Sequence, residues 1–276
     1  MQNATIQINA MSGMGDIFCD IYIAVIIANA FKKEDCNTDL KFYWGPHPVD
    51  NKKIFDDSFF DNFNSVETIN KPITESNYGD QKHIGFSGKA GIHHYDVFTN
   101  STSSVVNKDF AREAHVSATK CKAGNIRPKN IIKFSTTILD KVETFIQRIP
   151  ADHCFMHIRK RDHTGGLDKF LNIEEKLCEY IDNNFKNKNI HLGSDDLGLV
   201  ERISSSRDNV YHYDFSSLKT YKCNVQAERF EDVLAEMISV KYCNKIYLHN
   251  DYHWVSNFLY YGFIHGNKKP VEKIQF

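Results

Sequence analysis

The chain has 276 residues, of which 41% are hydrophobic and 25% are charged, a composition typical of a folded globular protein and not of a disordered one. Its 34 Lys and Arg residues nearly balance its 35 Asp and Glu residues, and the formal net charge is -1. This balance argues against a general attraction to nucleic acid or to acidic membranes. Any anion must therefore be bound by a local group of residues.

The first residues lack the basic start and apolar core of a signal peptide. The longest apolar stretch, residues 21–30, is much shorter than the roughly 20 residues that a membrane span needs. Seven scattered cysteines include no Cys-x-x-Cys pair, which argues against a zinc knuckle and favours a reducing compartment. We therefore expect a cytoplasmic protein without a membrane span. The abundance of Asn, Lys and Ile hints at an AT-rich bacterial, protist or viral genome.

The first half of the chain opens with the pattern of a Rossmann-type unit. Residues 5–10 alternate apolar and polar side chains as in a strand, a glycine turn follows over residues 11–16, and residues 17–31 form an apolar helical stretch. Residues 41–44 are predicted to form the second strand. Between residues 51 and 128 the periodicity is weak, so we expect short helices and loops up to residue 91 and irregular structure beyond.

The second half of the chain is predicted more clearly. Apolar residues recur at helical spacing over residues 130–148, and Pro150 would end that helix. Strands and helices then alternate, which predicts a parallel sheet covered by helices. The predicted strands span residues 153–158, 189–193, 209–213 and 245–248. The predicted helices span residues 173–185, 197–204, 230–243 and 253–261.

The glycine turn contains Gly13 and Gly15, which allow the backbone to approach a ligand closely just before free helical N–H groups. A third glycine is missing, so the turn does not match the dinucleotide-binding fingerprint. An ordinary tight turn between strand and helix is an equally good interpretation. The second strand also ends without an acidic residue, which argues against a nicotinamide enzyme.

Cationic side chains gather where the strand at residues 153–158 ends, in the segment His157-Ile158-Arg159-Lys160-Arg161-Asp162. Ligands of parallel sheets bind at the carboxyl ends of the strands. A fixed guanidinium there can neutralise charge that grows on a departing diphosphate. His157 and Arg159 share a strand face because side chains alternate. The alternative is a solvated charged loop.

Two carboxylates follow the next strand, in Gly193-Ser194-Asp195-Asp196. They can bind a metal, pair with the arginine cluster, or precede a helix whose N-cap is Ser194 or Asp195. No third oxygen ligand stands at a defined spacing, so no metal site is predicted. The histidine pairs at 93–94 and at 249 and 253 are likewise not predicted to bind zinc.

The order of these motifs resembles the GDP-fucose-dependent fucosyltransferase superfamily, which includes the α1,2-, α1,6- and O-fucosyltransferases. The segments that carry the resemblance are Gly13-Met14-Gly15-Asp16, His157 to Asp162, and Ser194-Asp195-Asp196. It is closest to the α1,6 type, because Gly165-Gly166 leads on to Phe170 and Ile173-Glu174-Glu175. The match covers roughly residues 126–262, and the first half matches only at its glycine turn. Lys160 replaces the second arginine, and Asn250-Asp251-Tyr252-His253 replaces a serine-rich loop.

The resemblance implies an α/β fold with two Rossmann-like lobes facing a cleft, the GT-B glycosyltransferase architecture. Residues 1–130 would form the lobe on the acceptor side, and residues 131–276 the lobe that binds the nucleotide sugar. The implied reaction inverts the anomeric centre, needs no metal or other cofactor, and moves fucose from GDP-fucose to a hydroxyl of a glycan or glycoconjugate. The implied partners are this donor and a carbohydrate acceptor, with no nucleic acid.

The resemblance also implies roles for particular residues. Arg159 would bind the β-phosphate with help from Lys160, and Asp168 would be the general base, with Asp162 and Asp16 in reserve. The remaining expected donor-binding residues are His157 near the nucleotide, Asp195 and Asp196 at the ribose or beside the arginine, Glu236 at the base or ribose edge, Gly13 and Gly15 at the diphosphate, and Tyr252 and His253 at the last helix. A transferase of the same fold with another nucleotide sugar, or an inactive sugar-binding relative, stays open as an alternative.

Overall fold

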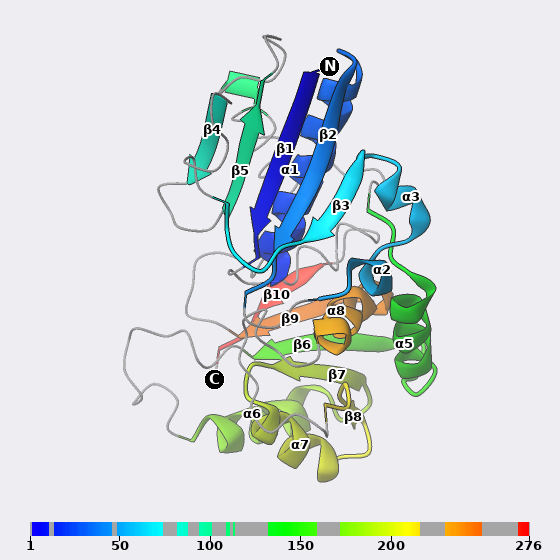
Figure 1. Cartoon of the computed structure of the whole chain (residues 1–276). Coiled ribbons are helices and arrows are strands. Elements are labelled where there is room, and N and C mark those ends of the chain that lie inside the picture. The colour runs from blue at the N-terminus through cyan, green and yellow to red at the C-terminus, as the bar shows by residue number, and fades with distance from the viewer. Residues whose placement is uncertain are drawn as a thin grey trace. The chain divides into compact units, whose positions relative to one another are not determined.

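The computed structural model describes residues 2–10, 14–45, 49–73, 82–87, 94–100, 109–110, 113, 132–158, 172–215, 230–249 and 270–275. The chain divides into two units, Met1–Leu139 with Cys223–Leu234, and Asp140–Lys222 with Ala235–Phe276. Each unit contains a five-stranded sheet, as Figure 1 shows. The boundary expected between residues 130 and 131 lies outside the described residues. The α/β class with two sheets, predicted from the sequence, is confirmed.

The N-terminal unit begins with the predicted strand, helix and strand. They are β1 (Gln2–Asn9), α1 (Met14–Lys32) and β2 (Cys36–Tyr43), and β1 and β2 pair in parallel. The helix starts at Met14 and not at residue 17. Gly15 therefore lies inside the first helical turn, where its backbone N–H is among the four that have no partner within the helix.

The rest of the N-terminal sheet differs from the prediction. β3 (Ser65–Thr68) runs parallel to β2, whereas β5 (His94–Thr99) is antiparallel to β1, and β4 (Lys82–Ser87) is antiparallel to β5. The sheet is therefore mixed, and the expectation of only short helices, loops and irregular structure over residues 51–128 was wrong for these strands. The expected short helices are α2 (Asn51–Ile54) and α3 (Asp57–Phe60).

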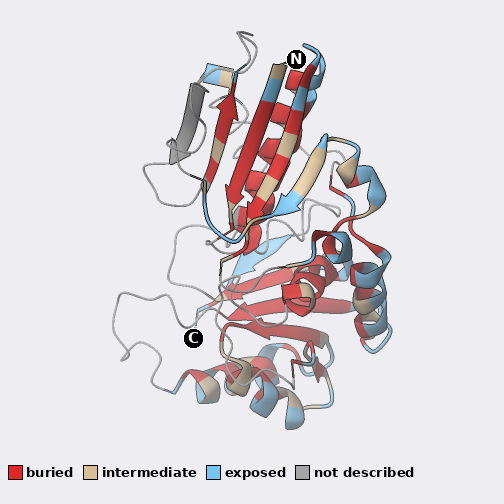
Figure 2. Cartoon of the chain, viewed as in Figure 1, coloured by how far each residue is buried: buried red, intermediate tan, exposed pale blue. Residues whose placement is uncertain are grey.

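Aromatic side chains dominate the core of the N-terminal unit. The ring of Phe18 on α1 lies 6.3 Å from that of Phe55 and 5.6 Å from that of Phe134. Phe42 stacks on Trp44 at 4.9 Å, and both are almost fully buried. Figure 2 shows the same burial along β1 and α1. Edge-to-face and offset contacts of this kind stabilise a core beyond the area that they bury.

The sheet of the C-terminal unit is entirely parallel. Its strands are β6 (His153–Ile158), β7 (Asn189–Ser194), β8 (Val210–Tyr211), β9 (Ile246–His249) and β10 (Val271–Lys273). They lie in the order β10-β9-β6-β7-β8. The four predicted strands are confirmed, although β8 is shorter than predicted. β10 was not predicted, because its three residues are exposed and two of them are charged.

The helices of this part of the chain follow the prediction with small shifts. They are α5 (Thr136–Ile146), α6 (Ile173–Asn184), α7 (Leu197–Ser205) and α8 (Phe230–Ser239). The first is shorter at both ends than predicted. The predicted helix over residues 230–243 ends as the short 3-10 helix η3 (Val240–Tyr242). The predicted helix over residues 253–261 lies outside the described residues.

The two faces of the C-terminal sheet carry different side chains. The face that packs on α6 and α7, called here the α6 face, is an apolar cluster that includes Met156 and Leu192. The opposite face, called here the α8 face, contains Phe155 and Leu248, which pack with Val240 just after α8. Side chains alternate along each strand, so the α8 face also carries His157, His191 and Gly193.

A topological switch point lies between β6 and β9. The chain leaves β6 through α6 to β7 on one side, and it reaches β9 on the other side of β6 through α8. α6 and α8 cover opposite faces of the sheet. In open parallel sheets, ligands bind beyond the carboxyl ends of the strands at such a point. The fold therefore indicates a ligand site at the ends of β6 and β9, next to Ile158 and His249.

Candidate functional site

The candidate site is the carboxyl edge of the C-terminal sheet. Ile158 ends β6 between Ser194 of β7 and His249 of β9, and Arg159 is the next residue of the chain. The cationic segment therefore begins at the switch point. Arg159 itself lies outside the described residues, as do the other expected site residues Gly13, Lys160, Asp162, Asp168, Tyr252 and His253.

Two expected donor-binding residues converge on one position of the α8 face. His157 pairs in register with Gly193 on the neighbouring strand, and it is buried. Glu236 reaches the same position from α8. A β-carbon placed on Gly193 would lie 3.2 Å from Oε1 of Glu236. The structure thus brings His157 and Glu236 to neighbouring places, one residue before the strands end.

Glu236 forms a close pair with a residue that was not predicted. Its Oε1 lies 3.8 Å from Nε2 of His191, whose side chain is fully buried, while that of Glu236 is 6% exposed. Removal from water disfavours the charged form of each group. Burial raises the pKa of Glu236 to about 8 and lowers the pKa of His191 to about 3. At neutral pH both side chains are therefore predominantly uncharged.

Aromatic rings enclose His191 on its strand. The rings of Phe145 on α5 and Phe155 on β6 lie 4.7 and 4.6 Å from the imidazole, both edge-to-face. Neither ring nitrogen of His191 forms a hydrogen bond with the residues that the structure describes. The 3.8 Å between its Nε2 and Oε1 of Glu236 is too long for a regular hydrogen bond.

Gly193 makes room for the pair. A β-carbon there would lie 2.8 Å from Cζ of Phe155 and 3.0 Å from its Cε2, closer than real β-carbon contacts. The absence of a side chain lets Phe155 and Glu236 occupy the space over β7. This glycine serves close packing and not an unusual backbone angle.

The two aspartates after β7 have separate positions. Asp196 is the N-cap of α7 and accepts a hydrogen bond from the backbone N–H of Leu199 at 3.2 Å. The interpretation of this segment as a helix cap is therefore confirmed, but the capping residue is Asp196 and not Ser194 or Asp195. Ser194 instead accepts a hydrogen bond from the backbone N–H of Asp196 at 3.1 Å. Asp195 is buried beside it. These two hydrogen bonds fix the turn from β7 to α7 at the carboxyl edge of the sheet.

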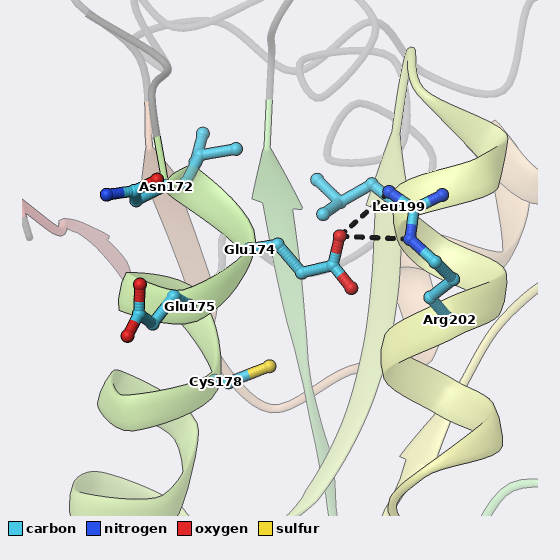
Figure 3. Close-up of a pocket in the computed structure, with 7 residues that line it drawn as sticks. Asn172, Glu174, Glu175, Cys178, Leu199 and Arg202 are labelled. Atoms are coloured by element: carbon cyan, nitrogen blue, oxygen red, sulfur yellow. Dashed lines mark hydrogen bonds and ion pairs between the residues drawn. The ribbon is translucent and has the colours of Figure 1, made fainter.

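A surface cavity of about 550 Å³ lies where α6 and α7 begin. Figure 3 shows Glu174 of α6 directed across it toward Arg202 of α7. The two form a salt bridge of 2.8 Å. The Ile173-Glu174-Glu175 segment, part of the resemblance to the α1,6 type, therefore links two helices here through one of its carboxylates. Asn172, which precedes α6, adopts a left-handed backbone angle of φ 64°.

Two features are absent from the part of the chain that the structure describes. The described residues contain no group of three or more His, Cys, Asp or Glu side chains that could hold a metal ion. Within the same residues, no helix is both long and apolar enough to cross a bilayer.

Several solved structures resemble this chain. They include a NodZ α-1,6-fucosyltransferase soaked with GDP-fucose (11% identity, TM-score 0.49, 96% of this chain and 93% of that one) and POFUT1 in complex with GDP-fucose (12%, 0.48, 98% of both chains). A third is a mutant of Arabidopsis thaliana FUT1 with GDP (11%, 0.45, 98% and 70%). Because each TM-score is below 0.5, these similarities alone assign neither fold nor function. No protein-family model and no curated protein matches the chain.

The sequence contained a signal for the residues that were missed. In Asn189-Ile190-His191-Leu192-Gly193, the apolar Ile190 and Leu192 face α6 and α7, so the alternation puts a histidine and a glycine on the other face. A buried strand with a polar residue between two apolar ones indicates a polar partner on the covering helix. Glu236 is that partner.

Proposed function

We propose that the chain is a glycosyltransferase that moves a sugar from a nucleotide-sugar donor to a hydroxyl of a glycan or glycoconjugate, with fucose from GDP-fucose as the first candidate. The observation that carries this proposal is the position of the cationic segment. It starts directly after Ile158, at the switch point of a parallel sheet, where ligands of such sheets bind. The order of the motifs around this point matches the fucosyltransferase superfamily.

The chemistry of transfer fits residues at this edge. Negative charge grows on the diphosphate as the sugar leaves, and the Arg159 guanidinium would neutralise it through two parallel hydrogen bonds. Lys160 would add charge without this planar geometry. A carboxylate, Asp168 first and Asp162 or Asp16 next, would take the proton of the acceptor hydroxyl. In this proposal the reaction inverts the anomeric centre and uses no metal.

The nucleoside would lie at the carboxyl edge of the sheet, beside the α8 face. His157 and Glu236 converge at Gly193, next to the strand ends that precede the cationic segment. Asp195 would contact the ribose or order the arginine, and Asp196 would hold the turn as the cap of α7. Backbone N–H groups at the start of α1, next to Gly13 and Gly15, and those near Tyr252 and His253 are the further candidates for the diphosphate.

Donor binding and turnover test the proposal. We expect GDP-fucose and GDP to raise the melting temperature of the wild-type protein, and GDP-fucose to be consumed when acceptor glycans are supplied. Arg159→Ala should lower turnover by about 100- to 1,000-fold, the loss typical for one group that stabilises a developing charge. Lys188→Ala is the matched control, because Lys188 lies before β7 at the opposite edge, with its Nζ 5.4 Å from the ring of Phe185.

The alternatives give different results in the same assays. Lys160 in place of a second arginine favours a test with other nucleotide sugars. A melting shift with one of those and none with GDP or GDP-fucose would exclude fucose and keep the transferase. Full turnover by Arg159→Ala would remove this arginine from the mechanism. A wild-type protein that binds sugars but consumes no donor would be an inactive sugar-binding relative.

A further inference from the structure

The pair of Glu236 and His191 brings two ionisable side chains together inside the protein. The two groups lie 3.8 Å apart, and both are almost completely removed from water. At this distance they do not form a regular hydrogen bond, but a charge on one still changes the proton affinity of the other. The carboxyl also stands at the edge of a proposed ligand site, directly over Gly193.

The ligand that the proposed function assigns to this site offers mainly hydrogen-bond donors to a carboxyl group. Guanine presents its N1–H and its exocyclic amino group, and the ribose presents hydroxyls. An ionised carboxylate is an acceptor only and matches these donors, whereas a protonated carboxyl has a donor of its own that competes with them. Such a ligand therefore binds the ionised form of Glu236 more tightly.

We propose that His191 is a positioning residue that sets the protonation of Glu236, so that a guanosine nucleotide binds with loss of the carboxyl proton to solvent. This inference rests on the proposed function. Before binding, the proton stays on the carboxyl, because an uncharged His191 at 3.8 Å stabilises a carboxylate only weakly and the Phe145 and Phe155 rings around His191 add no charge. On binding, the donors of the ligand replace that proton. Burial supports the first state by raising the pKa of Glu236.

Other ionisable groups lie near the pair on β6, after β8 and on α8. His157 lies on β6 next to Gly193, and His212 follows β8. His212 favours the ionised form of Glu236, and its own pKa is lowered by burial, with Asp214, Glu201 and Arg148 acting on it as well. Asp232 lies one turn before Glu236 on α8. Among these groups, His191 contacts the carboxyl directly, with its Nε2 3.8 Å from Oε1 of Glu236.

The proton linkage is tested by measuring GDP binding calorimetrically between pH 6 and pH 9, in two buffers that differ in ionisation enthalpy. The wild-type affinity should rise by up to tenfold per pH unit and level off near pH 8, and the buffers should reveal release of a proton. Glu236→Gln should remove this slope. The diphosphate of GDP also titrates in this range, but it contributes equally to both proteins, so their difference isolates Glu236.

Two histidine variants separate positioning from general structure. In His191→Phe the midpoint of the pH profile should move to higher pH, because a phenyl ring stabilises a carboxylate less than an imidazole does. His191→Gln should restore part of the wild-type profile. His153→Gln is the control, since His153 is equally buried at the other end of β6, where its Nδ1 lies 2.9 Å from the carbonyl oxygen of Pro150. Melting temperatures confirm that each variant is folded.

The outcomes distinguish this inference from the function on which it rests. If the wild-type protein binds GDP at no pH in the range, the proposed function fails. If GDP binds but wild type and Glu236→Gln share one pH profile, the proton linkage fails while the function stands. A His191→Phe profile identical to wild type would remove His191 from the linkage.

Discussion

The two faces of the C-terminal sheet are built from the same strands but serve different ends. On the α6 face, Met156, Ile158, Ile190 and Leu192 belong to one apolar cluster with α6 and α7. On the α8 face, residues at the alternate positions include histidines and a glycine, and a buried glutamate covers them. One face therefore stabilises the unit by removing apolar surface from water, whereas the other places polar groups at the edge where a ligand would bind.

This difference has an energetic side. A polar group removed from water lowers stability unless a partner compensates it, and the Glu236–His191 pair at 3.8 Å compensates only in part. Such a costly arrangement is common at functional sites, where perturbed proton affinities concentrate. The α6 face should thus respond to substitution through stability, and the α8 face through pH dependence and ligand affinity.

The largest effect on stability is expected on the α6 face, from Leu192→Ala. Leu192 is fully buried, and its loss leaves a cavity in the apolar cluster, which typically lowers the free energy of unfolding by about 2–5 kcal/mol. Urea denaturation measures this change. Leu139→Ala is the control, because Leu139 is 41% exposed and should change stability by less than about 0.5 kcal/mol. A loss below about 1 kcal/mol for Leu192→Ala would contradict the tight packing of this face.

A smaller effect is expected on the α8 face, from Gly193→Ala. The added methyl group would lie 2.8 Å from Cζ of Phe155, and the buried ring has to move, which typically costs about 1–3 kcal/mol. The methyl group also displaces Glu236, so nucleotide affinity should fall along with stability. Thermal melting and GDP binding measure the two consequences.

Gly198→Ala is the matched control for this substitution. A β-carbon on Gly198 would meet Nη1 of Arg202 at 3.0 Å, but this atom is the end of a flexible side chain. Alanine also favours the first turn of α7 more than glycine does. We expect unchanged or slightly higher stability. Equal destabilisation by both substitutions would show that the close packing of Phe155 and Glu236 over Gly193 does not determine the cost.

The contrast between the faces also explains what the sequence could predict. Strand and helix positions in the C-terminal unit followed from apolar periodicity, because parallel strands covered on both sides, such as His153–Ile158, are nearly continuous apolar runs. The edge strand Val271–Lys273 is short and exposed, so it left no such pattern. In the N-terminal unit, the strand His94–Thr99 was missed because its polar and apolar residues do not alternate regularly, although Tyr95, Val97 and Phe98 are buried.

The candidate site was predicted in part. His157 and Glu236 lie at neighbouring positions beside Gly193, and the donor-binding roles that the motif order implies for them stay predictions. The pairing of Glu236 with His191 was not predicted, because it depends on which helix covers the α8 face and how far Gly193 lets it approach. Contacts between residues distant in sequence depend on tertiary packing. The N-cap of α7 was misplaced by one or two residues, the usual uncertainty of helix ends.

A pH-dependent effect of intermediate size is expected for Glu236→Gln. The pKa of Glu236 is about 8 in the folded protein, above its ordinary value of 4.5, so the folded state holds the proton more tightly. The stabilisation that this proton gives the folded wild-type protein is fully present below about pH 4.5, and it is lost as the pH rises toward 8. Glu236→Gln has no such proton, so its stability does not fall in this way. Its stability relative to wild type should rise between pH 5 and pH 8, by at most the roughly 1.4 kcal/mol per pH unit that one linked proton allows.

His191 should act in the opposite direction. Its pKa is about 3 in the folded protein, below the ordinary 6.5, so the wild-type protein loses stability as the pH falls from 6.5 toward 3. His191→Gln should weaken that acid loss. Urea denaturation of wild type and both variants at pH 4, 5, 6.5 and 8 measures both slopes. Parallel curves for all three proteins would contradict a buried, uncharged pair.

The smallest effect is expected at the surface beside the site, from the salt bridge between Arg202 and Glu174. Its donor and acceptor side chains are 56% and 42% exposed, and such pairs contribute about 0.2–1 kcal/mol. A double-mutant cycle with Arg202→Ala and Glu174→Ala measures the coupling. The comparison is the bidentate pair of Arg207 and Asp182, in which Nε donates to Oδ1 at 3.0 Å and Nη2 donates to Oδ2 at 2.8 Å.

The second cycle should give the larger coupling. Arg207 is only 16% exposed, and its planar guanidinium donates to both oxygens of the Asp182 carboxylate, an arrangement that fixes geometry as well as charge. Both acidic partners lie on α6, whereas Arg202 lies on α7 and Arg207 lies two residues after α7 ends. A stronger coupling at Arg202 than at Arg207 would contradict this order, which follows from the lower exposure of Arg207 and from its bidentate geometry.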